Sequence, residues 1–233
     1  IQNFKSQNYW LVSAQLQKEK EKFTAHLFHL NDKSFNKLDI NQEIALETKK
    51  ELEQAEFKIN NIEQKQINKN SGAPFITSTL QQGANRHLGF SAKQTMTVAQ
   101  KLYERGFITY MRTDSLNLAP QFLDEVQNYL KNTLGEKYYL PTPRIFKTKG
   151  KNAQEAHEAI RPTDIYRTPE SLKSYLTPDQ HKLYDLIWRR TIATQMSPAV
   201  EERISVDIAG GEHYLFRAHG STLIFPGFKK AFL

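Results

Sequence analysis

The hydrophobic pattern of this chain changes its period twice. Six segments near its two ends alternate or run apolar like β-strands: 10–16, 23–28, 57–67, 203–208, 213–218 and 222–225. Between them, residues 74–196 follow the helical period instead. Because chain termini often lie close together and tolerate an inserted domain, this order predicts an α+β protein. We expect a helical domain over residues 73–196, inserted into a discontinuous antiparallel β domain made of residues 1–72 and 197–233.

The helical region carries local start signals. Its clearest helical segments are 77–88, 91–105, 118–134 and 178–195. Ser91 and Thr177 are each followed three residues later by Gln, which is capping-box spacing. Pro178 suits a first helical position, where its missing N–H would have no intrahelical partner. Closer to the start of the chain, Asn41 can cap a polar helix that runs to about Glu56.

The composition admits packed cores and favours a polyanionic partner. Hydrophobic residues make up 39% of the chain, and 32 Lys and Arg outweigh 25 Asp and Glu. The absence of cysteine excludes disulfides, thiolate zinc sites and cysteine nucleophiles, and agrees with a reducing compartment such as the cytoplasm. No run approaches the roughly 18 apolar residues that a membrane span needs, so we expect no membrane partner.

Residues 106–115, with the sequence GFITYMRTDS, hold the most informative motif. Gly106 can end the preceding basic helix, and the alternation of 107–112 predicts a strand with Tyr110 and Arg112 on one face. A phenol titrates near ~10, so a fixed cation beside it favours the nucleophilic phenolate. The same Arg can hold a phosphate with two hydrogen bonds, and Asp114 can orient it. From the spacing alone, ordinary surface packing of Tyr and Arg explains the pattern better than catalysis does.

A second motif, EAHEAIRPTD, occupies residues 155–164. It is not a zinc-protease motif, because Arg161 stands where the second zinc-binding His would be. Helical spacing would point His157 and Arg161 at one phosphate. From the spacing alone, an exposed, salt-bridged helix that Pro162 ends is the better explanation.

Two further segments carry weaker signals. Residues 72–82, GAPFITSTLQQ, place Thr77 and Ser78 at a helix start, where free N–H groups bind phosphate, and Gln81 can contact a base or sugar. Hydroxyl residues at a helix start are also ordinary caps. The segment 140–152 is rich in Pro and Lys and is expected to be an exposed basic loop.

Taken together, PFITSTLQ, GFITYMRTDS and EAHEAIRP, in this order and spacing, resemble the type IA DNA topoisomerases, particularly those of bacteria. The resemblance covers essentially the whole chain. It implies that Tyr110 attacks a phosphodiester of single-stranded DNA, forms a 5′-phosphotyrosine link and rejoins the strand without a nucleotide cofactor, relaxing negative supercoils. It further implies that Arg112 stabilises the phosphate and that His157 lies near it.

Other DNA contacts are expected on residues of the three motifs and of the basic helix. They are Thr77, Ser78, Gln81, Lys93, Arg105, Thr113, Asp114 and Arg161. In the family, a winged-helix-like domain that carries the tyrosine and its β domain form the mobile arch, and a Mg²⁺-binding Toprim domain and zinc modules flank it. No segment here resembles those flanking parts. We therefore expect no metal or cofactor within this chain, Mg²⁺ in the complete enzyme, partnership with the missing domains, and no DNA cleavage by the chain alone.

Two other functions fit parts of the sequence. A tyrosine nickase or recombinase would need a histidine metal cluster or more basic residues around the tyrosine, and the seven His are scattered. A non-catalytic DNA-binding module is the stronger alternative. In it, residues 91–112 would form a winged-helix unit that reads the DNA backbone.

Overall fold

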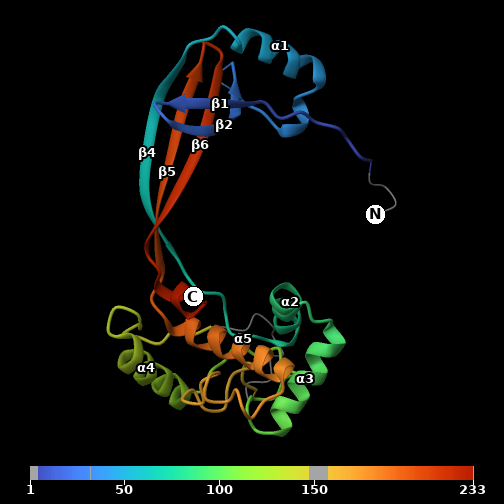
Figure 1. Ribbon diagram of the computed structural model, residues 1–233, viewed down its shortest axis with the longest axis vertical. Coiled ribbons are helices and arrows are strands. Elements are labelled where there is room, and N and C mark those ends of the chain that lie inside the picture. The colour runs from blue at the N-terminus through green and yellow to red at the C-terminus, as the bar shows by residue number, and fades with distance from the viewer. Residues whose placement is uncertain (1–4, 32, 147–156, 233) are drawn as a thin grey trace. The chain divides into compact units, whose positions relative to one another are not determined.

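The computed structural model describes residues 5–31, 33–146 and 157–232, which form two compact units (Figure 1). One unit takes the described residues up to Ile67 together with Glu201–Ile224, and the other takes Asn68–Val200 with the described residues from Phe225 onward. Helices and an antiparallel sheet occur together, which confirms the expected α+β class. The strands are β1 (Ser13–Lys18), β2 (Glu21–Leu30), β3 (Lys33–Ser34), β4 (Phe57–Lys69), β5 (Ala199–Gly210) and β6 (Tyr214–Phe225). The helices are α1 (Gln42–Leu52), α2 (Thr77–Leu88), α3 (Ala92–Glu104), α4 (Pro120–Leu134) and α5 (Pro178–Gln195), with short 3-10 turns η1 (Lys37–Asp39) and η2 (Gly227–Phe232).

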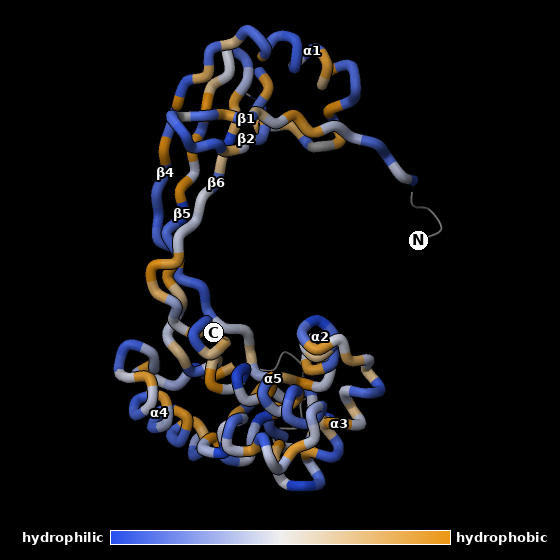
Figure 2. Tube along the Cα trace, viewed as in Figure 1, coloured by the Kyte–Doolittle hydropathy of each residue, from blue (hydrophilic) through white to orange (hydrophobic). Residues whose placement is uncertain are grey.

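In the described part of the first unit, six strands form one sheet in the order β1-β2-β6-β5-β4, with β3 beside β2. Antiparallel pairing of β2 with β6 joins segments from opposite ends of the chain. The small core of this unit centres on Leu27, Ile208 and Phe216, against which Phe57 packs edge to face. Figure 2 shows β4 mostly on the hydrophilic side of the scale, in agreement with its exposed side chains.

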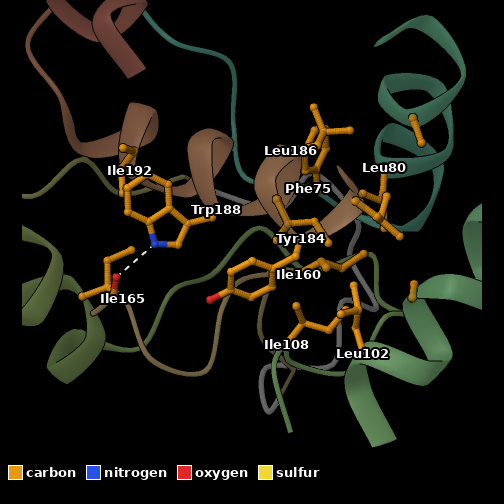
Figure 3. Close-up of a cluster of buried hydrophobic side chains, with 14 of the residues drawn as sticks. Phe75, Leu80, Leu102, Ile108, Ile160, Ile165, Tyr184, Leu186, Trp188 and Ile192 are labelled. Atoms are coloured by element: carbon orange, nitrogen blue, oxygen red, sulfur yellow. Dashed lines mark hydrogen bonds between the residues drawn. The ribbon is translucent and has the colours of Figure 1, made fainter. Parts of the chain in front are cut away.

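The second unit is built around α5, which packs against α2, α3 and α4. Tyr184 and Ile187 of α5 are fully buried, and Trp188 donates a hydrogen bond from Nε1 to the Ile165 carbonyl at 3.0 Å (Figure 3). Burial raises the pKa of the Tyr184 phenol, whose hydroxyl donates to the Arg167 carbonyl at 2.5 Å. The apolar stripe seen in the sequence of this helix is therefore core.

The predicted helix starts agree with the observed caps. The Ser91 side chain accepts from the Gln94 N–H, and Thr177 and Gln180 form a complete capping box. The Asn41 side chain caps α1, although that helix ends at Leu52, before the expected limit near Glu56.

The boundary between the units differs from the one expected. Residues 225–233 were assigned to the β domain, but the described residues from Phe225 onward pack with the helical unit. Arg189 of α5 donates to the Ala231 carbonyl at 2.9 Å, and the Phe228 N–H donates to the Ser197 carbonyl at 2.9 Å. Strand-like periodicity identified Phe225 correctly as the end of a strand, but periodicity cannot show which unit a chain end packs against.

Gly227 is expected to be essential for this closing turn. Its φ is +49°, and a Cβ there would lie 2.2 Å from the Pro198 carbonyl oxygen. Gly227→Ala should lower the free energy of unfolding by about 3 kcal/mol, because the clash adds to left-handed strain. Gly89→Ala is the matched control: its φ is +71° but no atom lies within 4 Å, so about 1 kcal/mol is expected. Urea unfolding of the two variants measures the difference, and equal losses would contradict the packing argument.

Among the described residues, no helix combines the length and the apolar character needed to cross a bilayer.

Candidate active site

The segment that carries Tyr110, residues 107–115, is a loop and not the predicted strand; we call it the tyrosine loop. Ile108 and Met111 are both 1% exposed, whereas Tyr110 and Arg112 face solvent, so burial across the predicted strand 107–112 does not follow a two-residue period. Its only regular pairing in the described chain is an isolated bridge between Ile108 and Pro162. The strand prediction was wrong because the apolar residues are anchored in the helical core at turn-like spacing.

Thr77, the first residue of α2, ties the tyrosine loop to that helix. Its Oγ1 donates to the Met111 carbonyl at 2.9 Å and accepts from the Thr113 N–H at 2.9 Å, while its own N–H donates to the Thr113 carbonyl at 3.0 Å. Thr77 was expected to contact DNA. Its hydroxyl fixes the position of the loop, and the residue also lines a pocket described below, so the DNA contact stays a prediction.

The second motif, from His157 onward, is extended where a helix was predicted; Glu155 and Ala156 lie outside the described residues. The Ile160 N–H donates to the Phe75 carbonyl at 2.8 Å, and the Thr109 N–H donates to the Arg161 carbonyl at 2.9 Å. The Arg161 N–H in turn donates to Thr109 Oγ1 at 3.0 Å. These backbone groups find partners on other segments, so no helical turn forms, and the helical i, i+4 pairing of His157 with Arg161 is corrected. Thr109, directly before Tyr110, joins the two motifs.

These ties gather residues from all three motifs around one pocket of about 550 Å³. Its walls hold, besides Ile76, most of the side chains predicted from the sequence: Thr77, Ser78, Gln81, Arg112, Thr113, Asp114 and His157. We call it the phosphate pocket, because the start of α2 supplies helix N-terminal N–H groups and Arg112 supplies a guanidinium fork. Motifs separated by up to about 80 residues in the sequence thus contribute to one surface hollow.

Tyr110 lies at a second, smaller hollow of about 280 Å³, which it lines with Thr109, Thr113, His157 and Glu158. The tyrosine side chain is 44% exposed. His157 and Thr113 line both hollows, so the hollow of Tyr110 adjoins the pocket that Arg112 lines. The arrangement places an accessible phenol next to a pocket that the Arg112 guanidinium lines.

A third hollow, of about 590 Å³, runs along α3; we call it the α3 groove. Arg112 lines one part of it, and the rest comes from α3 residues at helical spacing: Lys93, Met96, Thr97, Gln100, Lys101 and Glu104. Lys93 was predicted as a DNA contact. Met96, Gln100 and Glu104 were not, although their i, i+4, i+8 spacing in the sequence could have identified the face.

Two predicted DNA contacts have internal roles. Arg105 donates to the Gln180 side chain at 3.1 Å and to the Tyr175 carbonyl at 2.9 Å. The Arg161 side chain is 11% exposed and pairs with Glu158 at 2.6 Å. Neither arginine lines a pocket described here. Both guanidinium groups contribute to the fold, and their contact with DNA stays a prediction.

The described residues hold no group of three His, Asp or Glu side chains placed to bind a metal ion. Asp114 is the carboxylate of the phosphate pocket, and Glu158, at the tyrosine hollow, is already paired with Arg161. Mg²⁺ prefers several oxygen ligands, so the single carboxylate at each hollow does not fit this ion.

Comparison with known proteins agrees with this geometry. A family model described as DNA topoisomerase matches residues 1–232. DNA topoisomerase 1 of Rickettsia felis is 46% identical over 100% of the chain and 31% of its own length, and that of Xylella fastidiosa (strain Temecula1) is 40% identical over 98% and 30%. The full-length topoisomerase I structure from Thermotoga maritima aligns with a TM-score of 0.72 at 34% identity, over 90% of this chain and 34% of that one. The chain thus spans about a third of the length of its relatives. It belongs to the type IA DNA topoisomerase family, alongside the bacterial topoisomerase I proteins.

Proposed function

We propose that this chain supplies the nucleophile of an ATP-independent isomerase that breaks and rejoins single-stranded DNA through a 5′-phosphotyrosine at Tyr110, relaxing negative supercoils in the bacterial cytoplasm. The observation that carries the proposal is the junction at His157 and Thr113. There an exposed phenol adjoins the phosphate pocket that Arg112 lines.

The chemistry follows from these positions. Tyr110 Oη attacks the scissile phosphorus, a P–Oη bond forms, and the bond to the 3′ oxygen of the preceding nucleotide breaks. The phenolic proton is lost, and the departing 3′ oxygen gains one. Arg112 stabilises the charge that develops on the non-bridging oxygens, and His157 contacts the same phosphate.

Rejoining is the reverse reaction. The 3′ hydroxyl attacks the phosphotyrosine, and the phenolate leaves. A phenolate is a better leaving group than an alkoxide, so the covalent link conserves the phosphodiester energy and no nucleotide cofactor is required. Supercoiling stress alone then drives relaxation.

Two further elements of the proposal concern binding. Ser78, Gln81 and Asp114 contact the DNA strand at the phosphate pocket, and Lys93 contacts it at the α3 groove. In the complete enzyme, residues outside 1–233 would hold Mg²⁺, and the ion would supply neutralisation of phosphate charge. Residues 1–233 by themselves are therefore expected to bind single-stranded DNA without cleaving it.

The test is complementation. Residues 1–233 are mixed with a separately made N-terminal metal-binding region of a topoisomerase relative, Mg²⁺ and an end-labelled single-stranded oligonucleotide. We expect a covalent protein–DNA adduct on this chain that Tyr110→Phe abolishes, because the reacting hydroxyl is gone. Tyr175→Phe, at a tyrosine that is 66% exposed in the same unit, should form the adduct normally.

The α3 groove favours a second candidate, a non-catalytic winged-helix-type DNA-binding module. It predicts that replacing Lys93 and Lys101 abolishes DNA binding, that Tyr110→Phe changes nothing, and that no adduct forms although both fragments are folded and bind DNA. That set of results would replace the catalytic proposal.

A further inference from the structure

Tyr103 is an exposed aromatic residue of α3 with no role in the chemistry above. Its side chain is 40% exposed, and its ring centroid lies 5.2 Å from that of Tyr110, with the ring planes at 64°. An edge-to-face contact of this kind leaves part of an aromatic ring accessible. Tyr103 thus presents a second accessible aromatic ring beside Tyr110.

Tyr103 is not one of the residues that line the α3 groove, but it belongs to the same helix. It lies seven residues, or two helical turns, after Met96 of the groove and three residues after Gln100, so helical spacing places it next to the groove-lining face. From Lys93 to Tyr103 the helix rises about 15 Å. A strand that follows the groove from Lys93 past Lys101 therefore arrives at the Tyr103 ring and Arg112.

This combination is the arrangement by which proteins hold single strands: a cationic groove follows the phosphates, and an aromatic side chain stacks on a base. A base and its own phosphate are separated by one sugar. A phosphate at Tyr110 thus places a neighbouring base within reach of a ring whose centroid is 5.2 Å from the Tyr110 ring.

We propose that Tyr103 stacks on the nucleobase adjoining the phosphate that Tyr110 attacks, and that the α3 groove carries the strand beyond it. The inference rests on the proposed function, because it assumes a single-stranded DNA substrate. Stacking tolerates any base, so Tyr103 adds affinity without adding sequence preference.

The first experiment measures binding of a fluorescein-labelled oligothymidylate to residues 1–233 by anisotropy. Tyr103→Leu should weaken binding about ten-fold, within the range for losing one stacked base. Tyr103→Phe keeps the ring and should bind within about two-fold of the unmodified chain. Tyr175→Leu should do the same, because Tyr175 is an exposed tyrosine of the same unit that, unlike Tyr103, has no ring contact with Tyr110. Because Tyr103 is 40% exposed, the Leu variant should fold, and its circular dichroism and Tm verify this.

The salt dependence of Kd distinguishes a stacking contribution to binding from an electrostatic one. Tyr103→Leu should leave the slope of log Kd against log salt unchanged, whereas Lys93→Met should reduce it by about 0.7, the value for one phosphate of a single strand. In parallel, oligonucleotides with one 5-iodouracil at successive positions are irradiated, and cross-linked peptides are identified by mass spectrometry. We expect a cross-link to Tyr103 from one position only.

The outcomes are distinguishable. Equal binding by Tyr103→Leu and the unmodified chain, without a cross-link at Tyr103, would overturn this inference and leave the proposed function intact. Slower adduct formation with unchanged affinity and no cross-link would also overturn it, since Tyr103 would then only position Tyr110. Failure of the unmodified chain to bind any single strand would count against both proposals.

Discussion

Replacing Arg112 by Ala is expected to slow formation of the covalent adduct by about 10²–10³-fold while leaving the fold intact. Arg112 is exposed, lines both the phosphate pocket and the α3 groove, and has no ion-pair partner in the described part of the chain. Its loss therefore removes stabilisation of the charge that develops on the phosphate, and a single such donor has an effect of this size. Single-turnover adduct formation in the complementation mixture measures the rate.

Two variants complete this test. Arg112→Lys keeps the charge but loses the planar fork, so it should retain part of the rate. Arg167→Ala removes an arginine whose exposed pair with Asp164 lies at 3.6 Å, away from the pockets, and should react normally. A wild-type rate for Arg112→Ala, at saturating DNA, would exclude Arg112 from the chemistry.

The second large effect is expected on stability, at the contact between Glu158 and Arg161. Arg161 Nη2 lies 2.6 Å from Glu158 Oε2, and its guanidinium stacks 3.9 Å from the Phe122 ring. Glu158 Oε1 also accepts from the Ala119 N–H at 2.6 Å, at the start of α4, where the residue itself offers no side-chain cap. Glu158→Ala removes the carboxylate from the guanidinium, which keeps its hydrogen bond to the Pro162 carbonyl, and leaves this N–H without its acceptor.

We expect Glu158→Ala to reduce the free energy of unfolding by about 3 kcal/mol, at the lower end for a broken buried pair because the Glu158 side chain is 29% exposed. Urea denaturation of residues 1–233 measures it. Glu170→Ala is the matched control, since its pair with Lys173 is at 3.9 Å with side chains 84% and 69% exposed, and should cost under about 0.5 kcal/mol. Similar losses in the two variants would show that the Glu158 pair is no stronger than a surface pair.

Loss of Glu158 should also slow formation of the covalent adduct. The pair lies directly after His157, and the Thr109–Arg161 hydrogen bonds join this segment to the residue before Tyr110. Glu158→Gln keeps an acceptor for the Ala119 N–H but loses the charge pair, so its stability should fall between those of the unmodified chain and Glu158→Ala. If the adduct rate follows the same order, the pair positions the catalytic residues as well as supporting the fold.

Helix identity was readable from the sequence because it is a local property. The bounds of α2 and α5 agree with the predicted segments, and Ser91, Thr177 and Asn41 cap the helices that their spacing indicated. Caps and apolar stripes involve residues within one or two turns of each other, so the sequence contains the whole interaction.

The tyrosine loop and the segment after His157 were predicted wrongly for the opposite reason. Their backbone partners are Thr77, Phe75 and each other, at separations of roughly 35 to 85 residues, and periodicity within a short window cannot detect such bonds. Tertiary pairing overrode the local preference in both segments.

The sequence alone determined which chemical groups are available: a tyrosine and an arginine in one motif and a histidine in another, which together with a third motif identify the family. Only the tertiary structure decided how those residues are used. It placed Arg112 and His157 at the pocket, and it turned Thr77, Arg105 and Arg161 toward internal partners. The physical reason is that a cationic or hydroxyl side chain suits a phosphate and a buried carbonyl or carboxylate equally well, and packing decides which of them lies within hydrogen-bond distance.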